Sequence, residues 1–273
     1  MASDRDSGLD SWADHGIVIS CQGLRKDYGN VVAVRNLDIQ VASGRVLGLV
    51  GPNGAGKTTT MRCMAGIIPA TQGDVRIAGH IVGLETVEAK ANLCFVPDTP
   101  HLFNYLTVEE HLRFHGRIHG LADIEQRIER LLATFELRDK ARSLPQALSR
   151  GMKQKVAICI GFLHDPKAIF LDEPLTGLDP MGIRRMKDAI VERAKKHNAA
   201  VIVSSHQLEL VEEICDETLV LKNGEKVVSG TIDQLHDFLG VEQGALSLEA
   251  LFFRLTEDPA TESSAQHDAM SES

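Results

Sequence analysis

The stretch GPNGAGKTTT has the residue types of a loop that binds phosphate groups. It matches the pattern GxxxxGK[ST] over residues 51–58, after an apolar run typical of a buried strand and before a helical pattern. Backbone N–H groups of such a loop surround a β-phosphate, Lys57 reaches the β- and γ-phosphates, and the Thr58 hydroxyl binds Mg²⁺. The residues expected to hold the nucleotide are Gly51, Pro52, Asn53, Gly54, Ala55, Gly56, Lys57, Thr58 and Thr59.

Two adjacent carboxylates end the apolar run AIFLDE, residues 168–173. Successive side chains of a strand point to opposite faces, so Asp172 and Glu173 are expected to have different roles. We assign Asp172 to Mg²⁺, through the water around the ion, and Glu173 to orienting or deprotonating the attacking water. A strand that ends in an acidic turn is common, so this assignment depends on the phosphate-binding loop upstream.

A histidine, His206, ends another buried strand with the sequence VIVSSH. One interpretation places its imidazole at the carboxyl edge of the sheet, where it touches the γ-phosphate and the attacking water. The alternative is structural, because Ser204 and Gln207 have the spacing of a capping box and His206 would then lie in the first turn of a helix. The position at the sheet edge and the other motifs favour the first interpretation.

The segment ALSRGMKQK, residues 147–155, has the form of a helix start without chemistry of its own. Ser149 is suited to cap the helix, and good helix formers follow it. The segment contains no evident nucleophile and no metal-ligand spacing. Because the N-terminus of a helix favours negative charge, the segment raises the question of which phosphate it serves.

In their order along the chain, these segments resemble the motifs of the nucleotide-binding subunits of the ABC superfamily, over most of residues 16–240. The resemblance implies that ATP and Mg²⁺ bind in a head-to-tail pair of subunits. In that family the signature segment, here residues 148–152, binds the γ-phosphate of ATP held by the second subunit, which implies contacts from the Ser149 hydroxyl and the Gly151 N–H. It also implies that Asp179, in a D-loop of residues 177–179, lies at the seam, and that a monomer is nearly inactive.

Three further positions bear on this resemblance. Tyr28 stands where the family has an aromatic side chain that stacks on adenine, although a tyrosine in a turn is often only a turn residue. The signature is LSRGM where the family has LSGGQ, so Arg150 and Met152 replace glycine and glutamine. Asp98 replaces the glutamine of the family's Q-loop. It is shorter and charged, so we expect it to contact metal-bound water, while its reach and its role in coupling stay open.

The elements that must position these residues alternate between strands and helices. Thr107 and Glu110 have the spacing of a capping box, and from Thr107 the apolar spacing becomes helical. A helical region of about sixty residues is therefore inserted into a sheet protein. We expect an α/β fold, and the resemblance makes it a P-loop NTPase (RecA-like) mixed sheet core with an N-terminal antiparallel β subdomain and an inserted α-helical subdomain of about residues 101–163. The strand signals lie at residues 16–21, 37–44, 45–51, 74–79, 92–97, 167–174 and 199–206.

The C-terminal part reads as a hairpin and two amphipathic helices. The hairpin turns at Asn223-Gly224, one helix spans residues 231–239 before Gly240, and the other helix carries Leu248 and Leu251 on its apolar face. We expect both helices to pack against the domain rather than to form a dedicated interface. The predicted divisions are a flexible acidic N-terminal tail at 1–15, an ABC nucleotide-binding domain at 16–240, a C-terminal helix at 241–256 and a disordered acidic tail at 257–273.

Charge and cysteine usage exclude several classes of protein. The formal net charge is −9. Residues 1–15 contribute −3, from four aspartates and one arginine, and residues 257–273 contribute −5, from five acidic residues without Lys or Arg. The rest carries −1 and has no basic footprint for nucleic acid. Five scattered cysteines without a CxxC pair indicate a reduced, cytosolic compartment. The N-terminus has no apolar signal region, and no segment approaches the ~20 apolar residues of a spanning helix.

The resulting hypothesis is an ATPase subunit of an ABC exporter of a drug, antibiotic or lipid. It would work with a second ATPase subunit, identical or different, and a separate integral membrane permease, at the cytoplasmic face of the membrane. Export rests on the resemblance of LSRGM and of LEALFFRLT to exporter subunits. The alternatives are an importer subunit and a soluble ABC ATPase of the metal-cluster assembly or DNA repair type. A non-hydrolysing clamp conflicts with the presence of Glu173 and His206.

Overall fold

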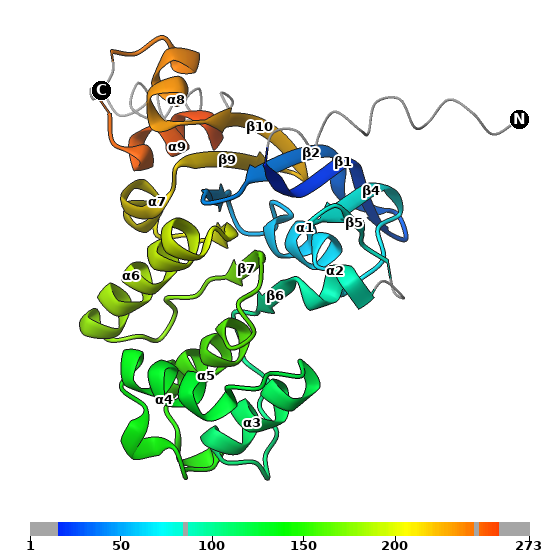
Figure 1. The fold of residues 1–273 in the computed structure, drawn as a ribbon. Helices are drawn as coiled ribbons and strands as arrows, with labels where there is room; N and C mark the ends of the chain where they lie inside the picture. The colour runs from blue at the N-terminus through cyan, green and yellow to red at the C-terminus, as the bar shows by residue number, and fades with distance from the viewer. Residues whose placement is uncertain (1–15, 84–86, 243–245, 257–273) are drawn as a thin grey trace, which may run out of the picture.

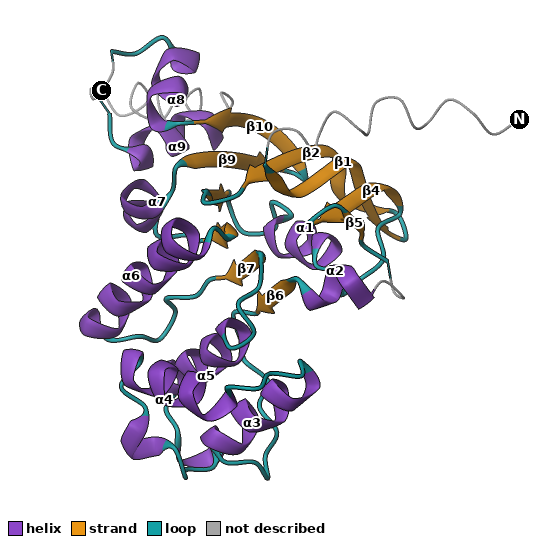
Figure 2. Cartoon of the chain, viewed as in Figure 1, coloured by secondary structure: helices purple, strands orange, loops and turns teal. Residues whose placement is uncertain are grey.

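The computed structural model describes residues 16–83, 87–242 and 246–256. The two acidic tails predicted at residues 1–15 and 257–273 lie outside the described residues. Most helices lie on one side of the strands and below them, while the strands within residues 17–42 and 72–81 form the opposite edge of the molecule (Figure 2). Within the described ranges, no helix combines the length and the apolar character needed to cross a membrane.

A six-stranded sheet forms the core of the fold. Its strands are β3 (Val46–Val50), β6 (Leu93–Val96), β7 (Ala168–Asp172), β8 (Ala200–Ser204), β9 (Glu217–Lys222) and β10 (Glu225–Gly230). The order is β10-β9-β3-β8-β7-β6, and all neighbours are parallel except the β9-β10 hairpin, whose turn at Asn223 and Gly224 is confirmed. β3, β7 and β8 are buried along their whole length, which explains their continuous apolar sequences.

An antiparallel sheet covers one face of this core. Its strands are β1 (Ile17–Tyr28), β2 (Val31–Ala42), β4 (Gln72–Ile77) and β5 (His80–Ile81), in the order β2-β1-β4-β5. β1 and β2 pair from Ile17 with Ala42 to Tyr28 with Val31, so both are longer than the predicted segments. The second half of β1, residues 22–28, is mostly polar and carries no apolar strand pattern. The first half of β2, residues 31–36, begins with the apolar run VVAV and was not predicted as a strand. The backbone ladder joins these two segments across the tight turn after Tyr28.

The core sheet separates two apolar clusters. Helices α1 (Lys57–Met64), α2 (Val87–Ala91), α6 (Pro180–His197) and α7 (Leu208–Ile214) cover it. Ile169 and Leu171 of β7 pack in the cluster that includes α6 and α7, whereas Ala168 and Phe170 pack in the cluster that includes α1 and the antiparallel sheet. Figure 1 shows these two groups on opposite sides of the sheet. Apolar side chains therefore fill both faces of the sheet, so polar side chains that could bind a ligand are found at the ends of the strands.

A helical lobe is inserted between β6 and β7. It contains α3 (Val108–Ile118), α4 (Ile124–Thr134), short 3₁₀ helices at Arg138–Lys140 and Pro145–Ala147, and α5 (Arg150–Phe162). The predicted capping box of α3 is confirmed, because the Thr107 hydroxyl accepts from the Glu110 N–H while the Glu110 carboxylate accepts from the Thr107 N–H. Figure 1 shows the lobe as a separate group beyond β6 and β7.

The C-terminal helices α8 (Ile232–Leu239) and α9 (Leu248–Thr256) pack at the opposite end of the molecule from the helical lobe. Thr231 caps α8 and Gly240 ends it in the left-handed conformation, as predicted. Leu248 and Leu251 of α9 are fully buried in a third apolar cluster with Leu235 of α8. The apolar faces of both helices are thus used in packing against the domain.

Two stacked imidazoles lie where the helical lobe joins the core. The ring of His164, just after α5, lies 3.9 Å from that of His119 between centroids, and its Nε2 lies 3.2 Å from Leu93 O. Burial lowers the pKa of His164 from 6.5 to about 4, helped by His119 and His115 and opposed by Asp165 and the Leu93 carbonyl. The folded protein therefore excludes a proton that the unfolded chain binds.

The free energy of unfolding is expected to fall as the pH drops below 6.5, because the unfolded chain then binds a proton at His164 that the folded protein does not. This loss continues to about pH 4, where the imidazole of the folded protein is protonated as well. Above pH 6.5 both states hold a neutral imidazole and the contribution of His164 to stability is fully present. Urea unfolding at about pH 7 and about pH 5 measures the difference. The His164→Asn variant should lose less stability on acidification than the parent, and His80→Asn, at an exposed histidine, should behave as the parent does. Equal losses in all three proteins would contradict this.

Candidate functional site

The loop between β3 and α1 is shaped by glycines that no larger residue can replace. Gly56 has a φ of +101°, in the left-handed region, and a Cβ there would lie 2.5 Å from Ala33 O. A Cβ at Gly51 would lie 2.4 Å from Leu221 O. Residues 51–56 thus form a tight backbone turn directly before the first turn of α1, where the N–H groups lack partners within the helix.

Lys57 folds back onto its own loop. Its Nζ donates to Gly51 O at 2.7 Å and to Pro52 O at 3.1 Å. Burial lowers the pKa of Lys57, while the nearby carboxylates of Glu173 and Asp172 act in the opposite direction. A polyphosphate in this loop would replace neutral carbonyl acceptors with charged oxygens, which form stronger hydrogen bonds with an ammonium group.

Asp172 lies at the carboxyl end of β7 and is almost fully buried. Its Oδ1 accepts from the Thr58 hydroxyl at 3.1 Å and from the Ser204 hydroxyl at 2.6 Å. Its Oδ2 is buried and has no hydrogen-bond partner among the residues that the structure describes. A buried carboxylate oxygen without a partner is costly, and carboxylate with hydroxyl oxygen is a donor set that suits Mg²⁺. Asp172 and Thr58 therefore fit a divalent cation at the phosphate-binding loop.

Glu173 and His206 form a direct pair. His206 Nδ1 lies 2.7 Å from Glu173 Oε2, and the His206 side chain is 63% exposed while that of Glu173 is 21% exposed. Glu173 has a φ of +49°, in the left-handed region that a glutamate rarely adopts, and its N–H donates to Ser204 O at 3.2 Å. The capping box considered for Ser204 and Gln207 is wrong, because α7 starts only at Leu208 and the Ser204 hydroxyl bonds Asp172 rather than capping a helix.

The signature segment starts a helix, as predicted. Ser149 caps α5, and its hydroxyl accepts from the Met152 N–H at 3.2 Å. A Cβ on Gly151 would lie 2.3 Å from Gly177 O, and the stem of Arg150 lies beside Gly177. The backbone of Gly177 therefore leaves room only for a glycine at position 151, whether or not a phosphate binds there. Figure 1 places α5 in the helical lobe, apart from α1 and its loop.

The remaining predicted site residues lie on other elements of the fold. Asp179 directly precedes α6 and lies 4.0 Å from Lys155 Nζ of α5. Tyr28 is the last residue of β1, half exposed, with Lys26 Nζ 5.0 Å from its ring centroid. Asp98 lies half-buried in the loop after β6. The structure thus brings Lys57, Thr58, Asp172, Glu173 and His206 together and leaves Ser149, Gly151, Asp179 and Tyr28 outside that cluster.

Ser204 is the residue that reasoning from the sequence missed. It is fully buried, and the register of the β7-β8 ladder places it directly beside Asp172. The sequence carried a signal, since Ser204 stands two residues before His206 at the end of a strand. The sequence indicates a role for Ser204 only in the structural alternative, as the cap paired with Gln207, because strand neighbours cannot be deduced from one segment alone.

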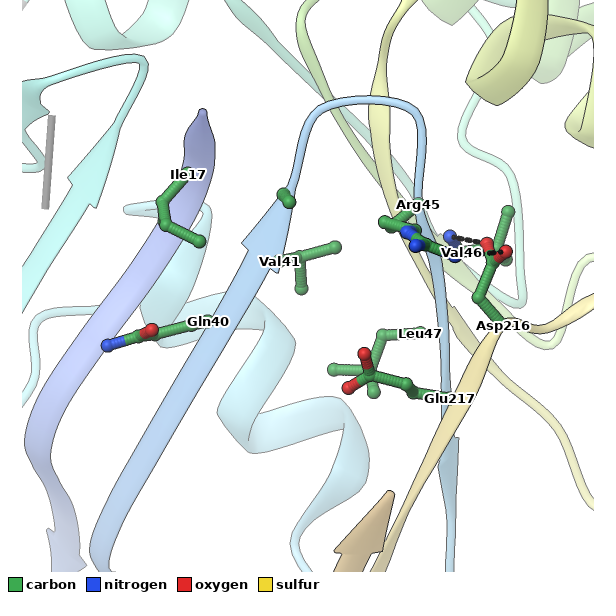
Figure 3. A pocket seen from close by; sticks show the side chains of 9 residues that line it. Ile17, Gln40, Val41, Arg45, Val46, Leu47, Asp216 and Glu217 are labelled. Carbon is green, nitrogen blue, oxygen red and sulfur yellow. Dashed lines mark hydrogen bonds and ion pairs between the residues drawn. The ribbon is translucent and has the colours of Figure 1, made fainter. Parts of the chain in front are cut away.

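A separate cavity of about 370 Å³ lies at the opposite, amino edge of β3 and β9. Figure 3 shows Arg45 and Asp216 joined by a hydrogen bond beside the apolar side chains of Val41 and Leu47. Since β3 starts at this edge and the phosphate-binding loop follows its other end, the cavity is not part of the site described above.

A phosphate-binding loop after one buried strand, with an acidic pair at the end of a nearby strand of a mainly parallel sheet, defines a P-loop nucleoside triphosphatase. The fold class predicted from the sequence is confirmed. The chain belongs to the ABC transporter family, whose model matches residues 34–176. It is an ATP-binding subunit and an ATPase of that family.

Known proteins support this assignment over most of the chain. The ABC-type transporter ATP-binding protein EcsA of Bacillus subtilis is 33% identical over 245 residues, which cover 89% of this chain and 98% of EcsA. The linearmycin resistance ATP-binding protein LnrL of Bacillus subtilis is 32% identical over 228 residues, covering 82% of this chain and 72% of LnrL. A solved ATP-binding subunit of an ABC transporter is 32% identical with a TM-score of 0.83, covering 88% of this chain and all of that one.

Proposed function

We propose that this subunit hydrolyses Mg-ATP in a head-to-tail dimer and thereby drives export of a drug, antibiotic or lipid through a separate membrane permease. The observation that carries the proposal is the division of the site. One cluster holds the phosphate-binding loop and the acidic pair, while the capped helix start at Ser149 lies in a different lobe. A second subunit, identical or different, would supply its own Ser149 and Gly151 to the γ-phosphate of this nucleotide.

Each residue of the cluster has a role in this proposal. Thr58 and Asp172 hold Mg²⁺, which when bound neutralises charge on the β- and γ-phosphates. The freed Lys57 ammonium binds the same phosphates. Glu173 orients or deprotonates the attacking water, and His206 fixes the Glu173 carboxylate and reaches toward the γ-phosphate.

The residues outside the cluster complete the assembled site. Tyr28 stacks on adenine with the ring face that Lys26 leaves free. Asp179 lies at the seam between the two subunits, where its contact with Lys155 ties it to the signature helix. Asp98 contacts metal-bound water from the loop after β6.

The proposed direction of transport is supported by relatives. One relative is named for resistance to linearmycin, which fits removal of a compound from the cell. An importer subunit is the second candidate, because the cluster around Asp172 is the same for either direction. A soluble ATPase of the metal-cluster assembly or DNA repair type is the third.

An exposed aromatic surface on the helical lobe is suited to the permease. Tyr105 is 92% exposed, and Phe103 and Phe114 are about half exposed and contact each other edge to face. Exposed aromatic side chains in one place are typical of protein interfaces. This surface follows Asp98 along the chain, so a partner bound there would touch the loop that leads to the nucleotide site.

The proposal is tested by affinity purification of the tagged full chain from detergent-solubilised membranes. Recovery of a stoichiometric multi-span membrane protein, and its loss when Phe103 and Tyr105 are both changed to Ser, is expected. The Glu129→Ser variant, at an exposed position of the same lobe, is the matched control. If the chain is purified with its ATPase activity intact but without any membrane protein, the result would favour the soluble alternative. It would also contradict the proposed peripheral location at the cytoplasmic face of the membrane.

Asp98→Gln is expected to leave ATP hydrolysis unchanged and to alter transport. Glutamine keeps a side-chain oxygen for metal-bound water, whereas its greater length and its lack of charge change the loop that leads from β6 to the helical lobe. Measuring ATPase activity and substrate efflux on the same reconstituted complex separates the two. If both rates stay at the parent value, Asp98 has no role in coupling. If hydrolysis itself falls, Asp98 belongs to the catalytic cluster instead.

A further inference from the structure

We infer that Ser204 is a positioning residue that fixes both carboxylates of the site through its one hydroxyl group. The inference rests on the proposed function, in which Asp172 binds Mg²⁺ and Glu173 acts on water. Ser204 ends β8, is fully buried, and touches neither the phosphate-binding loop nor His206 through any hydrogen bond of its side chain in the described ranges.

The first contact of the hydroxyl determines which oxygen of Asp172 is free. Ser204 Oγ donates to Asp172 Oδ1 at 2.6 Å, and the Thr58 hydroxyl donates to the same oxygen at 3.1 Å. Both protons go to Oδ1, so Oδ2 is left buried and without a partner. The carboxylate is thereby held in one rotamer with a single free oxygen for the hydrated metal ion.

The second contact stabilises the unusual backbone of Glu173. Its φ of +49° lies in the left-handed region, which costs free energy for a residue with a β-carbon. The Glu173 N–H donates to Ser204 Oγ at 3.1 Å and to Ser204 O at 3.2 Å, a three-centre hydrogen bond that holds this conformation. The Glu173 side chain is thus directed toward His206 Nδ1.

The two contacts depend on each other because a serine hydroxyl has one proton and two acceptor positions. The proton is used for Asp172, and an acceptor position is used for the Glu173 N–H. The hydroxyl therefore cannot rotate without breaking one bond and weakening the other. It links the carboxylate that binds the metal to the carboxylate that acts on water, although it touches neither the metal nor the phosphates.

Ser205 provides a matched control in the same chain. It is 2% exposed, next to Ser204, and its Oγ accepts from the Gln207 N–H at 2.9 Å. Replacing either serine by alanine removes one buried hydroxyl, but only Ser204→Ala changes the carboxylates. The Ser204→Thr variant keeps a hydroxyl and tests whether that group, rather than the size of the side chain, is required.

The test measures Mn²⁺ binding by electron paramagnetic resonance with ATP present, ATP binding without metal, and kcat, on the full chain. Ser204→Ala is expected to weaken Mn²⁺ binding and lower kcat by about 10- to 100-fold, with metal-free ATP binding unchanged. Ser205→Ala should behave as the parent does in all three, and Ser204→Thr should recover most of the metal affinity. Thermal unfolding of each variant shows whether Ser204→Ala loses more stability than Ser205→Ala.

Asp172→Asn separates the inference from the function on which it rests. If Asp172→Asn loses Mn²⁺ affinity while Ser204→Ala keeps the affinity of Ser205→Ala, the role of Ser204 is overturned and the metal site stands. If Asp172→Asn also binds Mn²⁺ as the parent does, the proposed metal site is wrong and the inference falls with it. If Ser204→Ala fails to fold, weak metal binding by folded Ser204→Thr would overturn the inference, and parent-like binding would support it.

Discussion

Glu173→Gln is expected to lower kcat by about 10²- to 10⁴-fold and to accumulate an ATP-bound dimer. The amide has the size of the carboxylate and keeps an oxygen for His206 Nδ1, but it cannot take a proton from water. Lys57, Thr58 and Asp172 stay in place, so nucleotide binding continues while cleavage stops. Because hydrolysis is what separates the two subunits in our proposal, the dimer should persist as long as ATP is present.

Gel filtration in saturating Mg-ATP measures this directly. Glu209→Gln removes the same charge from an exposed position of α7 and should remain active and should not accumulate as a dimer. A Glu173→Gln variant that is inactive but monomeric would remove the main support for the head-to-tail mechanism. A variant that hydrolyses ATP at the parent rate would show that Glu173 does not act on water.

Ser149→Arg is expected to lower turnover by about 10²- to 10³-fold while the isolated subunit binds ATP almost as the parent does. In our proposal the loop at residues 51–58 holds the subunit's own nucleotide, whereas Ser149 caps α5 in a different lobe. The large side chain would occupy the position that the proposal gives to the second subunit's γ-phosphate. The variant also loses the cap of α5, which costs about 1 kcal/mol of stability.

Ser149→Asp separates the cap from the proposed contact with phosphate. Aspartate keeps an acceptor for the Met152 N–H, so this variant should unfold at the same urea concentration as the parent. Its negative charge repels a phosphate, so turnover should still be lost. Full activity of Ser149→Asp, or a large loss of ATP affinity in isolated Ser149→Arg, would contradict a role for Ser149 toward a second nucleotide.

The local features of this fold were predictable because neighbouring residues in the chain determine them. The turn of the phosphate-binding loop follows from glycines at fixed spacing, and the caps at Thr107 and Thr231 follow from a hydroxyl followed three residues later by Glu or Gln. The turn at Asn223-Gly224 follows from residues that tolerate positive φ. The second half of β1 and the first half of β2 were missed, because these two segments form strands through the ladder that pairs them with each other across the turn after Tyr28.

The sequence by itself determined the class of chemistry: a loop for phosphates, two carboxylates and a histidine, each at the end of an apolar run. Only the tertiary structure decided which of these residues touch. The β7-β8 register places Ser204 beside Asp172, and the left-handed backbone at Glu173 directs that carboxylate to His206. The close approach of Gly151 to Gly177 was equally hidden. The physical reason is that composition and spacing act over a few residues, whereas register and side-chain contacts depend on strands and helices that are far apart in the chain.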